Sequence, residues 1–330
     1  MKTGLGRYSD SVEEFASGVD PDYSVVEASL DLKRGYVHAF VSGLVRPFFK
    51  VLRICRGRDC VVHATDELCG FFFLFVRGRR IVTVHHVIRP GEDRSSAYFR
   101  LWNFMTRVAL KHADEIIAVS PDTAREVRET FSPSVPVHVV FNSISDRYRR
   151  DDSVQRERIV GVVAELIPRK NVAESVEAFH ILSSMEGMDD CRMIICGHGM
   201  CKEELQEQIR SCGLSSKVEF IDSIGDDELI RFYNRIGVLF NTSLHEGVGM
   251  VTVEANKCGV PTLCLSSAAI PEDVLRGSIK CEGPQEMAER ARDLLSDPEL
   301  FARTSAECIR TGMEFGREFH DSMTEIYGHR

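Results

Sequence analysis

The stretch N-T-S-L-H-E-G-V-G-M-V-T-V-E-A-N-K-C-G-V-P, from Asn241 to Pro261, decides the fold of this chain. The apolar segment 238–240 precedes it, and apolar residues recur from Met250 onward at helical spacing. Gly259 and the proline two residues after it are residue types that commonly end a helix. The stretch therefore predicts a strand, then a glycine-bearing loop, then a helix.

Two glutamates frame this loop: Glu246 stands inside it, and Glu254 stands about two turns further along. A strand that leads through a loop into a helix aims backbone N–H groups and the positive end of the helix dipole at one point, which suits a diphosphate. Carboxylates beside a phosphate would repel it, so we expect both side chains to accept hydrogen bonds from sugar or ribose hydroxyls. An ordinary strand-to-helix turn with two solvated glutamates would show the same spacing.

The segment E-G-V-G-M-V-T-V-E-A resembles the E-G-F-G-x-x-x-x-E-A signature of retaining glycosyltransferases of family 4, which have the GT-B fold. The resemblance implies that Glu254 binds the ribose hydroxyls and that Glu246 binds hydroxyls of the donor sugar. It also implies that backbone amides of this loop surround the sugar and phosphate of the donor, with donor-binding residues Gly247, Val248, Gly249 and Met250.

A second candidate site, E-L-I-P-R-K-N at 165–171, directly follows another predicted strand. Arg169 and Lys170 stand in a strand-to-helix loop, where an anion would bind; a solvated basic turn is the alternative. The segment resembles the family's G-x-L-x-P-x-K-[GN] motif, which implies that Lys170 binds the donor diphosphate and that Arg169 assists. Ala164 replaces the usual glycine of the motif, and Glu165 stands where many members carry a second phosphate-binding arginine.

The N-terminal half matches the family more loosely. His85 ends the segment R-I-V-T-V-H-H, which resembles the family's T-x-H-D segment and implies that His85 faces the donor sugar. Gly4 and Gly6 resemble the donor-binding glycine loop before the family's first helix, predicted here over 9–16 with Ser9 or Asp10 as its cap. The strand that usually precedes this loop has no counterpart, so either the fold lacks it or the true start lies upstream.

Apolar strands alternate with helical segments along the rest of the chain, which predicts parallel, doubly wound sheets. The charged stretch 146–158 has no apolar pattern and is interpreted as a linker. With the resemblance, we expect an α/β protein of the GT-B class with two Rossmann-like domains facing a cleft. Its parts are an acceptor-side domain at 1–148, a donor domain at 149–310, and a C-terminal helix within 311–330 that crosses back. The strands are predicted at 23–30, 59–64, 80–86, 116–119, 137–141, 159–164, 191–196, 217–221 and 261–265.

Length and charge narrow the class of protein. The 330 residues, 43% of them hydrophobic, suffice for two globular domains. Residues 1–150 hold 22 Lys and Arg against 18 Asp and Glu, a net charge of +4, whereas 151–330 hold 19 against 32, a net charge of −13. The acidic half argues against a nucleic-acid partner, and the basic half could face an anionic one. Eleven cysteines and an N-terminus without an apolar leader predict a cytoplasmic protein with free thiols.

The segment 33–58 contains seven basic residues, no acidic residue and a roughly helical apolar stripe. Pro47 is expected to kink or break a helix here, so the stripe could belong to two short helices. The pattern is typical of a segment lying in a lipid interface, which predicts peripheral contact with an anionic membrane; a core-packed helix with a solvated basic face fits as well. The apolar run Gly70–Val76 is too short to span a bilayer.

Together these features predict a retaining glycosyltransferase that moves a hexose from a UDP- or GDP-linked sugar to a hydroxyl of a lipid-linked acceptor or growing glycan. The expected catalytic residues are His85, Lys170 and Glu246. No cofactor or metal is expected, because no D-x-D follows a strand, so cationic side chains and helix N-termini would meet the leaving-group charge. The R-K-N variant of the motif resembles mannosyl- and rhamnosyl-transferring members and favours GDP-mannose.

Two alternatives keep the fold but change the function: a sugar-nucleotide-binding protein without transferase activity, and a nucleotide-sugar epimerase. A nicotinamide-dependent dehydrogenase fits less well, because no G-x-G-x-x-G follows a strand with an acidic residue about 20 positions on.

Overall fold

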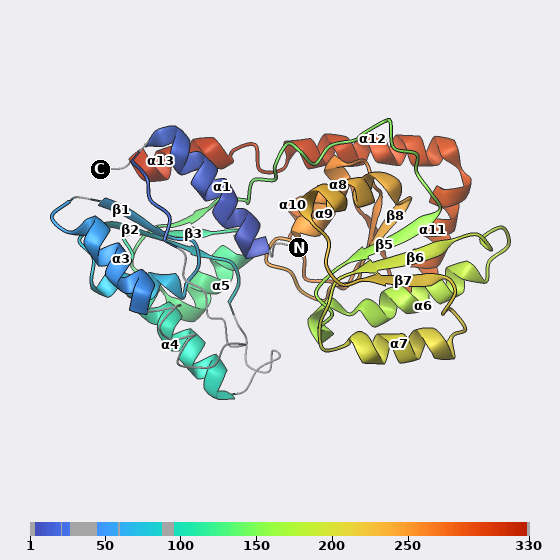
Figure 1. Cartoon of the computed structure of the whole chain (residues 1–330), viewed down its shortest axis with the longest axis horizontal. Coiled ribbons are helices and arrows are strands. Elements are labelled where there is room, and N and C mark those ends of the chain that lie inside the picture. The colour runs from blue at the N-terminus through green and yellow to red at the C-terminus, as the bar shows by residue number, and fades with distance from the viewer. Residues whose placement is uncertain (1–3, 21, 27–44, 59, 88–95, 329–330) are drawn as a thin grey trace. The chain divides into compact units, whose positions relative to one another are not determined.

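The computed structural model describes residues 4–20, 22–26, 45–58, 60–87 and 96–328. They form two compact units, each a parallel sheet with helices on both faces (Figure 1). Gly4–Asn142 and the C-terminal segment from Glu318 make up the first, called the N-unit below. Ser143–Arg317 makes up the second, called the C-unit. The predicted α/β class is therefore confirmed.

The C-unit contains a six-stranded sheet in the order β10-β9-β8-β5-β6-β7, with all neighbouring strands parallel. The central strands β5, β8 and β9 are buried at every position, which is why they appear in the sequence as continuous apolar runs. The three-residue edge strand β10 was not predicted. The strands are β5 (Ile159–Val163), β6 (Arg192–Cys196), β7 (Val218–Ile221), β8 (Val238–Asn241), β9 (Thr262–Leu265) and β10 (Ile279–Cys281).

Helices cover both faces of this sheet. Successive strand residues point to opposite faces, so Val160 and Val162 of β5 pack with Phe179 of α6 and Ile209 of α7, while Gly161 faces Ile236 at the end of α8. Helix α12 packs against α9. The helices are η4 (Pro168–Lys170), α6 (Val172–Ser183), α7 (Lys202–Ser211), α8 (Asp226–Arg235), α9 (Met250–Lys257), α10 (Glu272–Leu275), α11 (Pro284–Ser296) and α12 (Pro298–Glu314).

The N-unit contains a four-stranded parallel sheet in the order β1-β2-β3-β4. Its helix α5 begins as predicted, because the Ser120 hydroxyl accepts the backbone N–H of Thr123. No helix in the described ranges is both long and apolar enough to cross a membrane. The elements are α1 (Gly4–Val19), α3 (Arg46–Cys55), β1 (Cys60–Ala64), η3 (Cys69–Leu74), β2 (Gly78–Val84), α4 (Ser96–His112), β3 (Glu115–Ala118), α5 (Pro121–Phe131), β4 (Val137–Val139) and α13 (Phe319–Gly328).

The last helix, α13, is part of the N-unit although more than 170 residues of the C-unit separate it from the rest in sequence. With α1 it covers one face of the sheet, while α3, α4 and α5 cover the other (Figure 1). Phe319 and Met323 are buried against Tyr8 and Phe15 of α1. The Tyr327 hydroxyl lies 2.8 Å from Nδ1 of His63 at the sheet. The N-unit core is thus built from both ends of the chain.

The structure corrects the predicted start of the first helix. Helix α1 begins at Gly4, so Gly4 and Gly6 are helical residues rather than a loop, and Ser9 is not a cap. The physical reason is burial: Tyr8, Val12 and Phe15 form one apolar stripe at helical spacing, and Tyr8 is fully buried. The helix must extend past Tyr8 to place that side chain against the sheet.

The structure bears on three further expectations in the N-unit. Pro47 lies in the first turn of α3, where its missing N–H costs nothing, and because 33–44 lie outside the described residues the expected break at Pro47 stays a prediction. The strand expected at 59–64 is β1, and it is only half-buried: among the described residues it pairs with β2 alone, and Val61 is 46% exposed. Residues 22–26 form no strand, and the rest of the predicted strand at 27–30 lies outside the described residues, as does 33–44 of the basic segment.

Candidate functional site

The predicted strand, loop and helix are confirmed at the centre of the C-unit. Strand β8 ends at Asn241, residues 242–249 form the loop, and α9 begins at Met250. Gly249 precedes the helix with a φ of +83°, a left-handed conformation that glycine adopts without steric cost. Gly259, with a φ of +69°, ends the helix as expected.

The two motif loops lie side by side because they follow neighbouring strands. Strands β5 and β8 pair in parallel, so the residues after their carboxyl ends meet at one edge of the sheet. The Leu244 N–H donates to the Arg169 carbonyl at 2.9 Å, and the Thr242 hydroxyl donates to the Asn171 carbonyl at 2.9 Å. A third segment joins them, since the Glu246 N–H donates to the Ala269 carbonyl at 3.0 Å. Backbone hydrogen bonds thus fix the loop that carries Glu246.

At this edge Glu246 accepts hydrogen bonds from both motif cations. The Lys170 ammonium pairs with Oε1 of Glu246, and Nη1 of Arg169 lies 3.3 Å from Oε2. The same Arg169 nitrogen donates to the His245 carbonyl at 2.6 Å. The side chains of Lys170 and Glu246 are 15% and 11% exposed. Burial by itself would raise the pKa of the Glu246 carboxyl, but the two cations outweigh it and hold the pKa below its ordinary value.

The cluster of Arg169, Lys170 and Glu246 has the electrostatics of an anion site. Two positive charges and one negative charge leave a net charge of +1, in a half-buried position where charges interact more strongly than in bulk water. Arg169 is 32% exposed, so part of its guanidinium remains open to solvent. Such a cluster can receive a phosphate oxygen while Glu246 keeps a hydrogen-bond acceptor oriented.

Two glycines bring a neighbouring loop against the basic motif. A β-carbon at Gly197 would lie 1.8 Å from the Ala164 carbonyl oxygen, and one at Gly199 would lie 2.3 Å from the Leu166 carbonyl oxygen. Because no side chain fits at either position, the G-x-G segment permits a close backbone approach here. The Leu166 N–H donates to the His198 carbonyl at 2.9 Å across this contact. The approach supports the loop that leads to Lys170.

Glu254 lies deeper than its expected position near the loop. Its side chain is fully buried in α9, and Oε2 accepts a hydrogen bond from the Tyr233 hydroxyl of α8 at 3.0 Å. Reasoning from sequence missed Tyr233, which stands in an ordinary amphipathic helix without any motif. Val248, just before α9, and Met250, at its start, are also buried, at 6% and 8% exposure.

His85 belongs to the N-unit and follows β2 directly. Its Nε2 donates to the Thr65 carbonyl at 2.9 Å, and the Tyr8 ring packs edge-on against it at 4.9 Å between centroids. Burial lowers the pKa of His85, so the ring is neutral at pH 7 and Nδ1 carries a lone pair. His85 is therefore equipped to accept a hydrogen bond. Gly4 and Gly6 are also in the N-unit, within α1.

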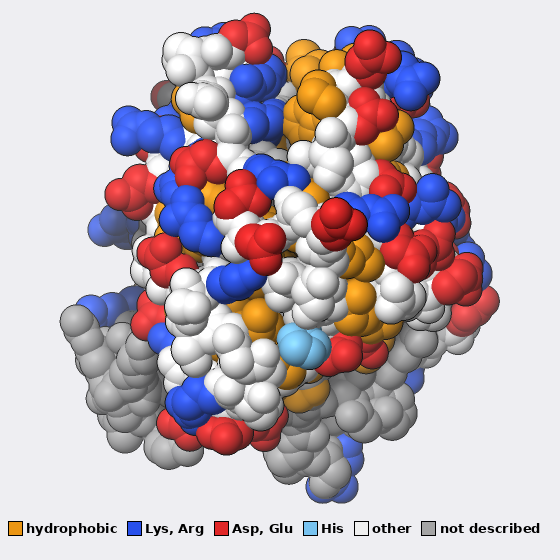
Figure 2. All heavy atoms as spheres, turned by 90° about the vertical axis from the view of Figure 1, so that its right-hand side faces the viewer, with side chains coloured by type: hydrophobic (Ala, Val, Ile, Leu, Met, Phe, Trp, Pro, Cys, Tyr) orange, Lys and Arg blue, Asp and Glu red, His pale blue; other side chains and the backbone are white. Residues whose placement is uncertain are grey.

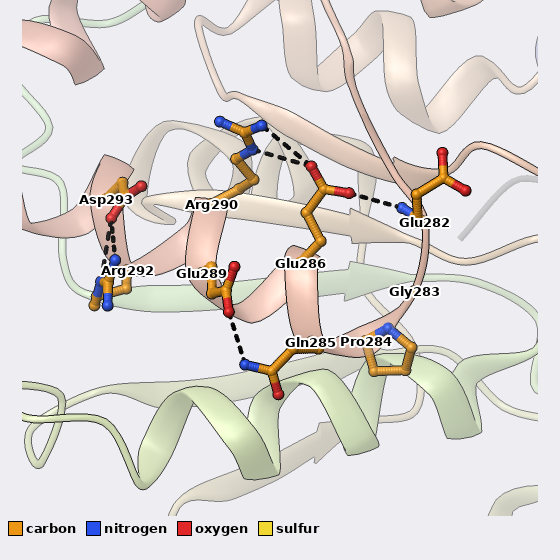
Figure 3. A pocket seen from close by; sticks show the side chains of 9 residues that line it. All are labelled: Glu282, Gly283, Pro284, Gln285, Glu286, Glu289, Arg290, Arg292 and Asp293. Atoms are coloured by element: carbon orange, nitrogen blue, oxygen red, sulfur yellow. Dashed lines mark hydrogen bonds and ion pairs between the residues drawn. The ribbon is translucent and has the colours of Figure 1, made fainter.

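A hollow of about 650 Å³ lies elsewhere in the C-unit, along α11 (Figure 3). Glu286 bonds Arg290 and the backbone N–H of Glu282, and Arg292 pairs with Asp293. The carboxylates that line this hollow outnumber its arginines, and both arginines are already paired. A phosphate would therefore be repelled there. In the ranges that the structure covers, no three His, Cys, Asp or Glu side chains gather as metal ligands would.

Comparison with family models identifies the protein family of this chain. Residues 145–311, which contain both motif loops, match the model described as glycosyl transferases group 1. The chain belongs to this family. Residues 16–147 match the model described as glycosyltransferase family 4, so the two matches together cover most of this glycosyltransferase.

Curated relatives of this glycosyltransferase are sugar-transferring proteins of bacteria and yeast. The O-antigen chain mannosyltransferase RfbU of Salmonella typhimurium is 22% identical, over 84% of this chain and 82% of the relative. The serotype-specific mannosyltransferase WbdA of Escherichia coli is 28% identical over 51% of this chain, and the match covers 23% of the length of WbdA. The chain thus spans less than a quarter of that relative.

Solved structures confirm the GT-B fold. WaaG, a glycosyltransferase involved in lipopolysaccharide biosynthesis, aligns with a TM-score of 0.73 at 12% identity, covering 100% of this chain and 97% of WaaG. HepE of Anabaena in complex with UDP aligns with a TM-score of 0.68 at 17% identity, covering 87% of this chain and 83% of HepE. At these identities the likeness shows the fold alone.

Proposed function

We propose that this glycosyltransferase moves a hexose from a nucleotide diphosphate sugar to a hydroxyl group, with retention of configuration at the anomeric carbon. The observation that carries the proposal is the half-buried cluster in which Arg169 and Lys170 converge on Glu246 at the carboxyl edge of β5 and β8. Developing negative charge on the leaving diphosphate is stabilised best by cations that are already in place.

In this proposal each site residue has a distinct task. Lys170, assisted by Arg169, binds the diphosphate and stabilises it as it leaves. Glu246 accepts hydrogen bonds from hydroxyls of the donor sugar, and the backbone amides of 247–250 at the start of α9 bind the sugar and phosphate. Glu254 accepts the ribose hydroxyls after exchanging its bond to Tyr233. His85 accepts a hydrogen bond from the sugar through its free Nδ1.

The proposal also concerns which nucleotide sugar is the donor. The mannosyltransferase names of RfbU and WbdA support mannose, and with it GDP-mannose. HepE has been solved with UDP-glucose, so a UDP-sugar is the competing donor. Incubation with a panel of UDP- and GDP-sugars, with nucleotide diphosphate release as the readout, separates the two.

The acceptor in this proposal is a hydroxyl of a growing glycan or a lipid-linked sugar, bound by the N-unit, in a cytoplasmic enzyme that contacts membranes peripherally. The name of RfbU, an O-antigen chain mannosyltransferase, supports a glycan acceptor. Adding membrane extract to the donor panel tests this, because a membrane-borne acceptor should accelerate release of the nucleotide. The anomeric configuration of the product, measured by NMR, tests retention.

We propose metal-independent transfer, with Lys170 and Arg169 in the role that a divalent ion takes in other enzymes. Activity should persist in excess EDTA. Activity lost in EDTA and restored by Mg²⁺ or Mn²⁺ would contradict this part of the proposal and leave the transferase assignment intact.

A protein that binds the donor without turnover remains a second candidate. The exposed Glu165 favours it, because this carboxylate stands where many family members carry a second phosphate-binding arginine. A nucleotide-sugar epimerase would change the sugar without an acceptor. Donor binding with no nucleotide release and no altered sugar would identify a binding protein, and an altered sugar still linked to its nucleotide would identify an epimerase.

A further inference from the structure

Helix α3 of the N-unit presents two different faces. Arg46, Phe49, Lys50 and Arg53 stand at i, i+3, i+4 and i+7, so they share one side of the helix, and all four are exposed. On the opposite side, Val51 and Leu52 pack against the core that includes Val82 and Val84 of β2. The outward side therefore consists of three cations and one phenylalanine that is 63% exposed.

Helix η3, the apolar run too short to span a bilayer, extends this surface. Phe75 and Leu74 are 48% and 41% exposed. The Phe48 ring joins them to α3, since it lies 4.9 Å from Phe75 and 5.2 Å from Phe49 between centroids, in edge-to-face contacts. We call this surface, made of Arg46, Phe49, Lys50 and Arg53 with Leu74 and Phe75, the α3–η3 face.

The arginines of the α3–η3 face have no acidic partner among the described residues. In the ranges that the structure describes, neither Arg46 nor Arg53 makes an ion pair or side-chain hydrogen bond, and the same holds for the exposed Arg56, Arg58 and Arg77 that follow in sequence. Lys50 bonds the Val25 carbonyl at 3.0 Å, which leaves its charge unneutralised. Helix α3 itself contains no acidic residue. The positive charge here therefore lacks a counter-charge within the described chain.

We propose that the α3–η3 face binds the surface of an anionic phospholipid membrane, with Phe49, Leu74 and Phe75 inserted between the head groups and Arg46, Lys50 and Arg53 against lipid phosphates. Exposed aromatic and aliphatic side chains beside cations are the combination that favours a lipid interface. Each cation near an anionic leaflet adds to the attraction. The inference deepens the proposed function, because it gives a lipid-linked acceptor a defined place of encounter.

Two other occupants fit this face less well. A second copy of this chain bound isologously through the same face would place its cations against identical cations. A nucleic acid could bind the cations and stack on exposed rings, but it offers no apolar interior to cover the aliphatic Leu74. A membrane accepts both the charge and Leu74.

The test is co-sedimentation with vesicles, with no sugar nucleotide present. Vesicles of phosphatidylcholine with phosphatidylglycerol should bind the protein, vesicles of phosphatidylcholine alone should bind it at least about tenfold more weakly, and binding should fall as salt rises. Failure to bind anionic vesicles at low salt would overturn the inference, and so would equal binding to both vesicle types. This salt series uses the unaltered protein, so it does not depend on any variant folding.

Matched variants locate the contact. Arg46→Glu with Arg53→Glu should weaken vesicle binding more than about tenfold, whereas Arg125→Glu, which reverses an exposed cation on α5, should leave it within about twofold. Phe49→Ser with Phe75→Ser should weaken it about tenfold, whereas Phe104→Ser, which removes a 59% exposed phenylalanine of α4, should not. Control variants that weaken binding as much as the face variants would overturn the assignment of the contact to this face.

Other outcomes point to other partners or to the proposed function. Binding to RNA but not to vesicles, or a dimer that the Arg46→Glu and Arg53→Glu variant dissociates, would overturn the membrane inference. Vesicle binding without nucleotide release from any donor would refute the transferase proposal while sustaining the α3–η3 face. Turnover of a soluble donor without vesicle binding would sustain the transferase proposal and refute the membrane role of the α3–η3 face.

Discussion

The two units differ in where their polar groups find partners. On the C-unit, basic and acidic side chains alternate over the surface (Figure 2), and many are paired, as Arg158 is with Asp190 at 2.7 Å and Arg310 with Glu307 at 2.5 Å. On the α3–η3 face of the N-unit, Arg46 and Arg53 have no such partner within the part of the chain that the structure describes, and Phe49 is exposed beside them. The difference teaches that many charges of the C-unit are paired within it, whereas cations of the α3–η3 face are unpaired among the described residues, which is what the membrane proposal uses.

The largest expected effect is on activity, and it compares two ion pairs of the C-unit: one in the candidate site and one on the surface. Lys170→Ala removes the cation that pairs with the half-buried Glu246 and should reduce donor turnover by about 3–4 kcal/mol of transition-state stabilisation, on the order of 100-fold or more. Lys202→Ala removes a surface lysine paired with Asp222 and should change turnover little. Nucleotide release measured for both variants tests this, and equal activities would make the Lys170 pair structural.

The next effect concerns pH and falls in the N-unit. Burial, together with the charge of Asp66, raises the pKa of Glu67 to about 8, although backbone N–H groups, among them that of His85, and the Trp102 side chain donate to its carboxyl. The pKa of Glu67 is higher in the folded than in the unfolded protein, so the folded state holds this proton more tightly. The resulting contribution to stability is fully present below the unfolded pKa and is lost as pH rises to about 8. Stability should fall by at most about 1.4 kcal/mol per pH unit in that window.

Glu67→Gln should remove this slope, because glutamine carries no proton to lose. Urea unfolding at a series of pH values between 5 and 9, chosen about one unit apart, measures it. Glu286→Gln, a change at a half-buried carboxyl of the C-unit that pairs with Arg290, serves as the control and should leave the slope as it was. A slope that persists in Glu67→Gln would show that another group titrates.

A smaller effect should follow from the buried pair in the C-unit. Tyr233→Phe removes the hydroxyl that donates to Oε2 of Glu254 at 3.0 Å, and it should lower the free energy of unfolding by about 1–2 kcal/mol. In the proposed function, Tyr233→Phe frees Oε2 of Glu254 to accept a hydrogen bond from a ribose hydroxyl. The loss of donor-binding free energy should therefore be smaller than the loss of stability. Unfolding and donor binding measured on one preparation separate the two; a loss of affinity equal to the loss of stability would make Glu254 structural.

The smallest effects compare one helix cap in each unit. Ser120→Ala removes the fully buried hydroxyl that caps α5 and should cost about 1–2 kcal/mol. Asp297→Ala removes an exposed carboxylate that accepts the N–H groups of Glu299 and Leu300 at the start of α12, and it should cost about 0.5–1 kcal/mol. Thermal unfolding checks both, and a larger loss for Asp297→Ala would reverse the expected order.

The sheet of the C-unit could be predicted closely because its central strands are buried on both faces. Strands β5, β8 and β9 appear as uninterrupted apolar runs bounded by turn residues, and each was predicted within about a residue of its observed end. Strand β10 was missed because three residues at a sheet edge, one of them Lys280, carry almost no pattern. In the N-unit, Gly4 and Gly6 misled the prediction, since the buried Tyr8 outweighs the low helix propensity of glycine.

The candidate site was predictable in part. Spacing placed Lys170 and Glu246 in loops after two strands, and the pairing of β5 with β8 explains why these loops meet. That Glu246 itself bonds both cations could not be predicted, since side-chain direction depends on the hydrogen bonds of the loop with Arg169 and Ala269. The burial of Glu254 against Tyr233 was missed for a similar reason, because it depends on how α8 packs on α9.

The position of α13 within the N-unit has a consequence for the order of assembly during translation. Folding on the ribosome proceeds from the N-terminus as residues emerge, at about 5–20 residues per second. The N-unit begins first, yet Phe319, Met323 and Ile326 complete its core, so it must wait until the whole C-unit has been synthesised. The C-unit, though it starts later, has all its residues available earlier. A nascent chain of this protein therefore carries an open apolar face on α1 and β2 for the time that about 175 residues take to emerge, and this is the interval in which a chaperone would be needed.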